Sequence, residues 1–228
     1  MKPYLELAKP RIAAMVALTA WLGWALAGGT AETSLPIMIL GVTLASAACG
    51  ALNQYLERDA DSVMHRTRNR PLPTGRVSPR RALIFGLVLA VLGPHLVWLA
   101  SGALAAWLTM ATTLLYVLAY PPLKKIKPKT TWIGAAAGAT APVIGWVAAG
   151  GPLDSRAFVL FSIQFLWQIP HFLALFWIHR EDYARAGFRV MPVVYPGGGT
   201  TAVQIAIHSF TLLPATLAPA FVGMARPG

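Results

Sequence analysis

The sequence predicts an all-α protein, a polytopic bundle of transmembrane helices that forms a single domain over residues 1–228. Hydrophobic residues make up 56% of the chain and charged residues only 12%, and the hydrophobic residues stand in long blocks instead of the short periodic stripes of a soluble protein. A bilayer core of about 30 Å requires roughly 20 apolar residues per helix. Seven windows meet or approach that length, and we expect spans near residues 12–29, 34–56, 82–100, 102–120, 131–150, 157–179 and 202–224.

Local features support these windows in chain order. The first span begins at Arg11 and has no small-residue cleavage site after a short apolar core, so we expect a retained helix and not a signal peptide. The second span holds Cys49, the only cysteine, among small residues that favour close helix packing. An arginine-rich segment precedes the third span and a lysine cluster follows the fourth. The sixth contains Pro170, which lacks a backbone donor and predicts a kink.

The charge distribution predicts the orientation of the bundle. The chain has 19 Lys and Arg against eight Asp and Glu, a net charge of +11. Seventeen of the basic residues fall before the first span or in the second, fourth and sixth connections between spans, which leaves Arg156 and Arg226 for the opposite side. The positive-inside rule makes the basic side cytoplasmic. We therefore expect a multi-pass inner-membrane protein with a cytoplasmic N-terminus, surrounded by membrane lipid, and no nucleic-acid partner.

A ladder of oxygen-bearing side chains ends the second span. Asn53, Glu57 and Asp61 are spaced four residues apart, so at helical pitch they project from one face across about 12 Å. Mg²⁺ prefers oxygen ligands and typically binds one or two carboxylates plus substrate phosphates. Asp59 falls on another face, where we expect it to pair with a neighbouring Arg. The sequence therefore predicts a magnesium site at Asn53, Glu57 and Asp61.

The connection that follows the ladder is unusually rich in arginine. Seven Arg residues stand between the second and third spans, more than orientation requires, and the Arg fork binds phosphate oxygens in pairs. Carboxylates for a metal beside cations for oxyanions describe a diphosphate site. The alternative is a solvated, charged helix end followed by an ordinary positive-inside loop. Asn53 favours the first interpretation, because a polar amide inside an apolar helix is a candidate functional residue.

Several motifs in this order resemble the intramembrane prenyltransferases of the 4-hydroxybenzoate polyprenyltransferase type, and specifically the protohaem IX farnesyltransferases, or haem O synthases. The first signature runs from Asn53 to Pro79. The other matching segments are residues 9–11, 120–125, 142–146, 167–172, 182–187 and 191–192. Together they span nearly the whole chain.

The resemblance implies a helical bundle around a central cavity, Mg²⁺-bound farnesyl diphosphate, and farnesylation of a vinyl group of protohaem IX. By position, Asn53, Glu57 and Asp61 would hold Mg²⁺ and the diphosphate, and Asp182 matches the surviving acid of the second signature. Cationic residues that would neutralise the leaving diphosphate are Arg66, Arg70, Lys124 and Lys125. The family usually has nine helices, so the seven expected here imply either a C-terminally incomplete chain or a short variant.

Residues 167–172 are expected to serve the acceptor. A kink at Pro170 would widen the cavity for a macrocycle, where His171, beside Trp167 and Gln168, could contact the haem. Aromatic side chains that could shelter a farnesyl cation are Tyr55, Tyr116, Tyr120, Trp146 and Trp167. A handover of the product to a haem-modifying or oxidase-assembly protein is a further expectation.

Two other interpretations remain open at this stage. One is an intramembrane prenyltransferase with another acceptor, such as 4-hydroxybenzoate or a chlorin. The other is a transporter, which would require paired broken helices and charges deep in the spans. The charges of this chain gather at one membrane face instead.

Overall fold

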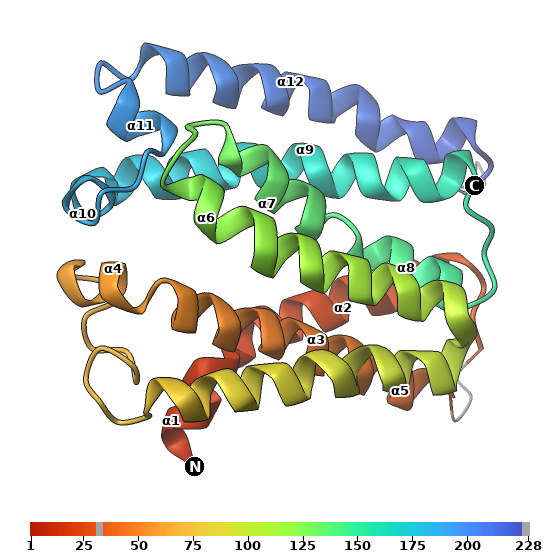
Figure 1. The fold of residues 1–228 in the computed structure, drawn as a ribbon. Helices are drawn as coiled ribbons and strands as arrows, with labels where there is room; N and C mark the ends of the chain where they lie inside the picture. Colours follow the sequence, from red (N-terminus) through yellow and green to blue (C-terminus); the bar gives the residue numbers. More distant parts are fainter. Residues whose placement is uncertain (31–33, 225–228) are drawn as a thin grey trace.

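A computed structural model describes residues 1–30 and 34–224, and every regular element in these ranges is a helix. The helices lie side by side as a bundle (Figure 1). The predicted all-α transmembrane class is therefore confirmed. The elements are α1 (Lys2–Ala8), α2 (Pro10–Leu26), α3 (Ser34–Leu56), α4 (Arg58–Val63), α5 (Pro79–Leu114), the π-helical turn η1 (Leu115–Ala119), α6 (Tyr120–Lys124), α7 (Thr130–Gly138), α8 (Ala141–Ala148), α9 (Ser155–Ile178), α10 (Arg180–Arg185), α11 (Met191–Val194) and α12 (Gly199–Phe221).

The long helices account for all seven predicted spans. Four of them correspond to the shorter α2, to α3, to α9 and to α12, and the pair α7 and α8 forms a fifth, Thr130–Ala148. The stretch Pro79–Lys124 contains the remaining two, because Gly102 has a left-handed φ of 80° and a ψ of −177° that no helix can accommodate. The chain reverses direction there (Figure 1), so residues 79–101 and 103–124 cross separately.

Local sequence sets where the long helices begin. Pro79 stands in the first turn of α5, where its missing N–H costs no hydrogen bond, and the Ser78 hydroxyl accepts from Arg81 N at 3.4 Å. Asp154 caps α9 in the same way, with its carboxylate accepting from Arg156 N at 2.9 Å. These caps satisfy backbone donors that a membrane interior could not.

Small residues bring neighbouring helices into contact. A Cβ atom on Gly41 of α3 would lie 2.7 Å from the Gly93 carbonyl oxygen of α5, and one on Gly145 of α8 would overlap the Ala20 carbonyl oxygen of α2. Such close backbone approach is typical of membrane bundles, where packing replaces the hydrophobic effect as the driving force between helices. Around these crossings a core forms from residues of α2, α3, α5, α8 and α9.

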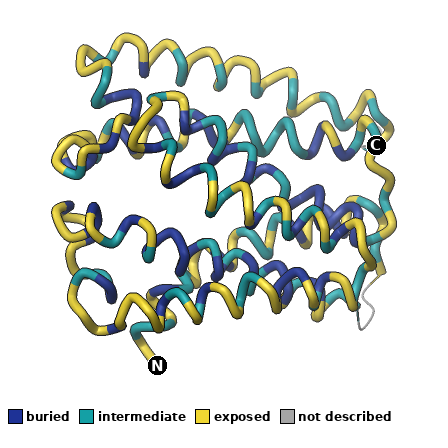
Figure 2. The backbone as a smooth tube through the Cα atoms, viewed as in Figure 1, coloured by how far each residue is buried: buried dark blue, intermediate teal, exposed yellow. Residues whose placement is uncertain are grey.

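The outer surface of the bundle is apolar. Trp107, Phe210 and Leu217 are 70%, 71% and 64% exposed, and exposed positions run along the outside of α5 and α12 (Figure 2). A soluble protein does not leave such residues in contiguous exposed bands. The chain is an integral membrane protein, and these faces contact lipid.

The polar connections gather at one end of the bundle. In Figure 1, α4, α10 and α11 lie at this end together with the loop between α4 and α5, and α1 packs beside them. The three connections that carry most of the basic residues therefore share one side, as the sequence predicted. Arg226, assigned to the opposite side, lies outside the described residues.

Candidate active site

The predicted ladder is present and buried. Asn53 lies in the last turn of α3, Glu57 joins α3 to α4, and Asp61 lies in α4. Glu57 N donates to Asn53 O at 2.9 Å and Asp61 N donates to Glu57 O at 2.7 Å, so the helical spacing continues through the junction. The three residues are 5%, 4% and 0% exposed and line one cavity of about 710 Å³. The common face that the spacing predicted is observed.

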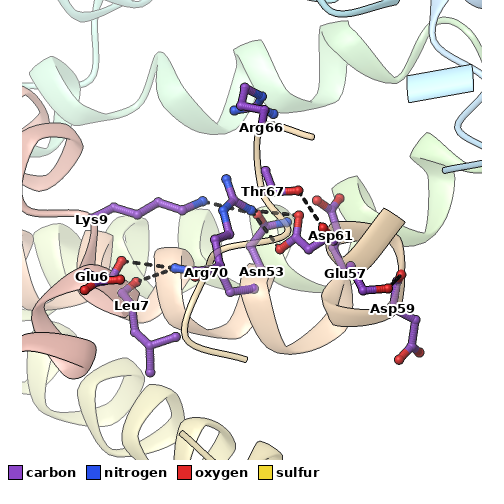
Figure 3. A network of polar contacts seen from close by, with 12 residues as sticks. Glu6, Leu7, Lys9, Asn53, Glu57, Asp59, Asp61, Arg66, Thr67 and Arg70 are labelled. Atoms are coloured by element: carbon purple, nitrogen blue, oxygen red, sulfur yellow. Dashed lines mark hydrogen bonds and ion pairs between the residues drawn. The ribbon is translucent and has the colours of Figure 1, made fainter. Parts of the chain in front are cut away.

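Each step of the ladder is bonded to a cation from a different part of the chain. Lys9 Nζ donates to Asn53 Oδ1 at 3.3 Å, and Lys124 Nζ lies 3.2 and 3.3 Å from the two carboxylate oxygens of Glu57. Arg70 Nη1 lies 2.9 and 2.8 Å from the two oxygens of Asp61 (Figure 3). Three oxygen donors are thus matched with three cations inside one cavity.

Lys9 also lines this cavity, although the sequence did not predict its place there. It has a φ of 48° between α1 and α2, the only positive φ at a residue other than glycine within the described ranges. Strained backbone of this kind persists where the surrounding structure requires it. Burial, and then the neighbouring Arg70 charge, lower the pKa of Lys9 from 10.5 to about 8.

The lining of the cavity is positively charged overall. Its charged residues are Glu6, Lys9, Arg11, Glu57, Asp61, Arg66, Arg70 and Lys124, five cations against three carboxylates. Lys124 is 6% exposed and lies over the rings of Tyr183 and Phe188, at 5.0 and 4.3 Å from their centroids. Arg66 Nη2 donates to the Tyr183 hydroxyl at 3.4 Å. An anion that entered this cavity would meet an excess of two positive charges.

Two predicted positions lie outside the cavity. Asp59 is exposed and pairs with Arg58 at 3.7 Å, which confirms that it projects from another face than the ladder. Lys125 is also exposed and is absent from the residues that line the cavity, because the helical turn at α6 that buries Lys124 directs the next side chain outward. The structure brings Lys9, and not Lys125, to the ladder.

Asp182 is near the site but bonded to the backbone. Its Oδ1 accepts from His65 N at 3.0 Å and from Arg185 Nη1 at 2.7 Å, and its Oδ2 accepts from Arg66 N at 3.1 Å. Burial raises the pKa of Asp182, but the bonds from Arg66 N and His65 N and the Arg185 charge lower it more, so the pKa lies below its ordinary value. The residue does not line the cavity.

A smaller apolar cavity adjoins the polar one. It has a volume of about 220 Å³ and shares Lys9, Ile12, Tyr116 and Phe172 with the polar cavity. Tyr116 stacks on Tyr120, with ring centroids 5.4 Å apart, and Tyr120 lines the polar cavity. The two spaces together offer a charged end and an apolar end to one ligand.

Of the residues expected to bind the acceptor, one lies inside the bundle and two lie on its outer face. Gln168 is 6% exposed, lines the apolar cavity, and donates to Gln164 O at 3.1 Å. Trp167 and His171 lie on an exposed face of α9, stacked with centroids 5.2 Å apart, and neither lines a cavity described here. α9 runs as one helix through Pro170, and Phe172 takes the inward position.

The other aromatic candidates also lie away from the polar cavity. The Arg58 guanidinium lies over the Tyr55 ring, 5.0 Å from the ring centroid. Trp146 is buried in the core, where its indole donates to Pro152 O at 2.8 Å. Neither residue lines either of the two adjoining cavities.

The donor set of the ladder suits Mg²⁺. Within the described residues no group of three or more His, Cys, Asp or Glu lies close enough to hold an ion. Mg²⁺ does not require such a group, because it keeps several waters and completes its shell with substrate phosphates. Glu57 and Asp61 supply two carboxylates. Asn53 adds an amide oxygen, and its Nδ2 is buried without a partner, which leaves a donor for a phosphate oxygen.

Comparison with known proteins identifies relatives along almost the whole chain. Residues 13–227 match the UbiA prenyltransferase family. The chain is 40% identical to the protohaem IX farnesyltransferase of Solibacter usitatus, over 98% of this chain and 80% of that protein. It is 41% identical to the protohaem IX farnesyltransferase of Koribacter versatilis, over 96% of this chain and 72% of that protein.

Solved structures share the fold at lower sequence identity. The apo structure of a UbiA homolog from Aeropyrum pernix K1 superimposes with a TM-score of 0.82 at 18% identity, covering 96% of this chain and 82% of that one. A UbiA homolog from Archaeoglobus fulgidus bound to DMAPP and Mg²⁺ gives a TM-score of 0.76 at 19% identity, covering 99% of this chain and 79% of that one. At these identities the likeness establishes the fold alone.

Proposed function

The chain belongs to the UbiA prenyltransferase family, and we propose that it transfers a farnesyl group from farnesyl diphosphate to a vinyl group of protohaem IX, releasing diphosphate. The relatives that match nearly its full length at about 40% identity are protohaem IX farnesyltransferases. It is a membrane prenyltransferase, and haem b to haem o is the conversion it catalyses.

One observation supports the location of this chemistry most strongly. The cationic cavity that contains the ladder adjoins the apolar cavity, and Lys9 and Tyr116 line both. A farnesyl diphosphate has the same division, with a trianionic head and an apolar chain. The head would lie among the ladder cations and the chain would extend toward Thr112 and Gln168.

The cations of the ladder would drive cleavage of the allylic C–O bond. As this bond breaks, its electron pair passes to the diphosphate, and Lys9, Arg70 and Lys124 stabilise the charge that develops there. Preorganised charges of this kind act strongly because they are sheltered from water. Each cation must first leave the ladder oxygen that it contacts in the free protein.

The oxygens released by that exchange would hold the metal. Asn53, Glu57 and Asp61 would bind Mg²⁺, which when bound neutralises negative charge on the diphosphate oxygens. Arg66 also lines the cavity, where it is bonded to Tyr183, and would bind the outer phosphate. The carboxylates and the cations thus change partners as the substrate enters.

The allylic cation that forms must be protected until the acceptor attacks. The stacked pair Tyr116 and Tyr120 stands where the two cavities meet, and aromatic faces attract a cation. The haem vinyl group then donates its π electrons to the farnesyl carbon. Water adds to the new cation beside the ring and loses a proton, which leaves the hydroxyethylfarnesyl group.

The orientation and onward partner are part of the proposal. The end of the bundle that carries the site would face the cytoplasm, since it collects the basic connections. The product would pass to a haem-modifying or oxidase-assembly protein, because a modified haem in a membrane must be received by another protein.

A direct assay tests the reaction and its acceptor together. The purified chain in detergent is incubated with farnesyl diphosphate and Mg²⁺ and offered haem b, 4-hydroxybenzoate or a chlorin in separate reactions. We expect a farnesylated product by mass spectrometry with haem b alone. A product from 4-hydroxybenzoate and none from haem b would overturn the proposal that haem is the acceptor. The assignment to the prenyltransferase family would still stand.

A further inference from the structure

We propose that Asp182 is a positioning residue that fixes the Arg66 loop over the diphosphate site, and that it is not a metal ligand. The inference rests on the proposed function, since it assigns a role within that site. The resemblance to the prenyltransferases matched Asp182 to the surviving acid of the second signature, and this inference gives that acid a specific role.

The carboxylate closes a contact between two distant segments. Asp182 lies at the start of α10 and accepts hydrogen bonds from His65 N and Arg66 N. These two amides directly follow α4, more than 100 residues before Asp182 in the sequence. Two adjacent N–H groups directed at one carboxylate form an anion-binding arrangement of the backbone, here occupied by the protein's own side chain. Such charge-assisted bonds are stronger than bonds between neutral groups.

The next residue in the chain holds the side chain of the same arginine. Tyr183 accepts from Arg66 Nη2 at 3.4 Å, so Asp182 fixes the backbone of Arg66 and Tyr183 contacts its guanidinium. Met64, 1% exposed, packs with Tyr183 and Phe188 in one apolar cluster directly before the loop. Along the chain, the loop is therefore anchored by the apolar contact of Met64 and then by the bonds between the Asp182 carboxylate and the next two residues.

The oxygens of Asp182 are already committed. Oδ1 serves His65 N and Arg185 Nη1, and Oδ2 serves Arg66 N. Asp182 is 8% exposed and lines neither cavity, whereas its neighbour Tyr183 lines the polar one. A metal in the ladder would have to draw the carboxylate away from two backbone amides, and the loop would lose the bonds that hold it.

The two acidic signatures would therefore have different roles in the site. Asp61 and Glu57 act on the metal, and Asp182 acts through Arg66 on the diphosphate. Removing Asp182 should therefore weaken the binding of farnesyl diphosphate more than it slows the step after binding, and it should leave the metal affinity of the ladder unchanged.

Hydrogen exchange measures the anchor without any need for turnover. In the full-length protein in detergent, the amides of His65 and Arg66 should exchange slowly, and Asp182→Ala should speed them about tenfold or more. Asp182→Asn, which keeps the size but loses one acceptor, should give an intermediate rate and serves if the alanine variant does not fold. Arg185→Ala, which keeps both backbone bonds, and the exposed neighbour Glu181→Gln should leave the exchange close to wild type.

Binding measurements separate the two roles. For Asp182→Asn the KM for farnesyl diphosphate should rise about tenfold with kcat within about threefold, and the dissociation constant of Mn²⁺ at saturating inorganic diphosphate should stay at the wild-type value. Asp61→Asn should raise the Mn²⁺ dissociation constant in the same assay.

The outcomes that overturn the inference are distinct from failure of the proposed function. Unchanged exchange at residues 65 and 66 together with weakened Mn²⁺ binding in Asp182→Asn would make Asp182 a metal ligand. A wild-type protein that binds neither diphosphate nor Mn²⁺ would contradict the proposed function, while the exchange data would still decide whether Asp182 holds the loop.

Discussion

Arg70 pairs with the buried Asp61, and its Nη1 lies 2.9 and 2.8 Å from the two carboxylate oxygens, although the residues are nine positions apart in the chain. The loop after α4 folds back so that its arginine reaches the last step of the ladder. In the free protein the Arg70 guanidinium neutralises the Asp61 carboxylate. When the substrate binds, Arg70 would move to a phosphate and leave Asp61 for the metal.

The carboxylates of the ladder should be essential. Glu57→Gln and Asp61→Asn should each lower kcat/KM by about a hundredfold or more, on the scale of roughly 3 kcal/mol for loss of a key electrostatic group. Asp59→Asn is the matched control, since its side chain is 83% exposed and pairs with Arg58 outside the cavity. A comparable loss in Asp59→Asn would show that the wrong face of the helix had been chosen.

Lys9 should give the reaction a pH dependence. Its pKa is lowered to about 8, so the side chain is cationic below that pH and neutral above it. If the cation binds diphosphate, kcat/KM should fall as the pH rises through about 8, because this ratio reports groups of the free enzyme. Lys9→Arg remains charged and should abolish this fall. A decline of equal size at the same pH in Lys9→Arg would assign it to another group.

The stability of the folded protein should depend on the pair of Lys124 and Glu57. Their side chains are only 7% and 5% exposed, so Lys124→Met would strand a buried carboxylate at a cost of about 3–5 kcal/mol. The double variant Lys124→Met, Glu57→Gln should regain most of the lost stability but no activity. Thermal unfolding in detergent provides the measurement. Additive losses in the double variant would show that the two side chains do not depend on each other.

Cysteine labelling should decide the orientation. In a Cys49→Ala background, Lys127→Cys at the site end should resist an impermeant thiol reagent added to intact cells. Leu153→Cys, 54% exposed at the opposite end, should react and is the matched control. Labelling of position 127 with protection of position 153 would reverse the orientation, and the site could not draw on a cytoplasmic donor.

The sequence predicted the spans well because length and apolar composition are local properties. The reversal occurs at Gly102, the first residue of the window predicted at 102–120, since a glycine between two apolar blocks is where a chain can turn. The short helices α1, α4, α10 and α11 were not predicted. They are held by packing at the membrane surface, and four to seven residues carry too little periodicity to be recognised.

The site was predictable where spacing along one helix determines it and not where helices must be brought together. The ladder at Asn53, Glu57 and Asp61 follows from a fixed pitch. The inclusion of Lys9 depends on a backbone turn before Pro10 with a φ of 48°, which no local preference of lysine predicts. The outward position of His171 could not be foreseen either, because apolar residues occur around the whole circumference of α9 and its rotation is set by its neighbours.

The partner exchange at the ladder is the central claim, and Mn²⁺ binding followed by electron paramagnetic resonance tests it most directly. In the free protein the ladder oxygens are bonded to Lys9, Lys124 and Arg70, so Mn²⁺ alone should bind weakly. Addition of inorganic diphosphate, which draws those cations away, should tighten Mn²⁺ binding by about tenfold or more, and Asp61→Asn should remove most of that gain. Mn²⁺ that binds equally tightly with and without diphosphate, and equally in wild type and Asp61→Asn, would contradict the account.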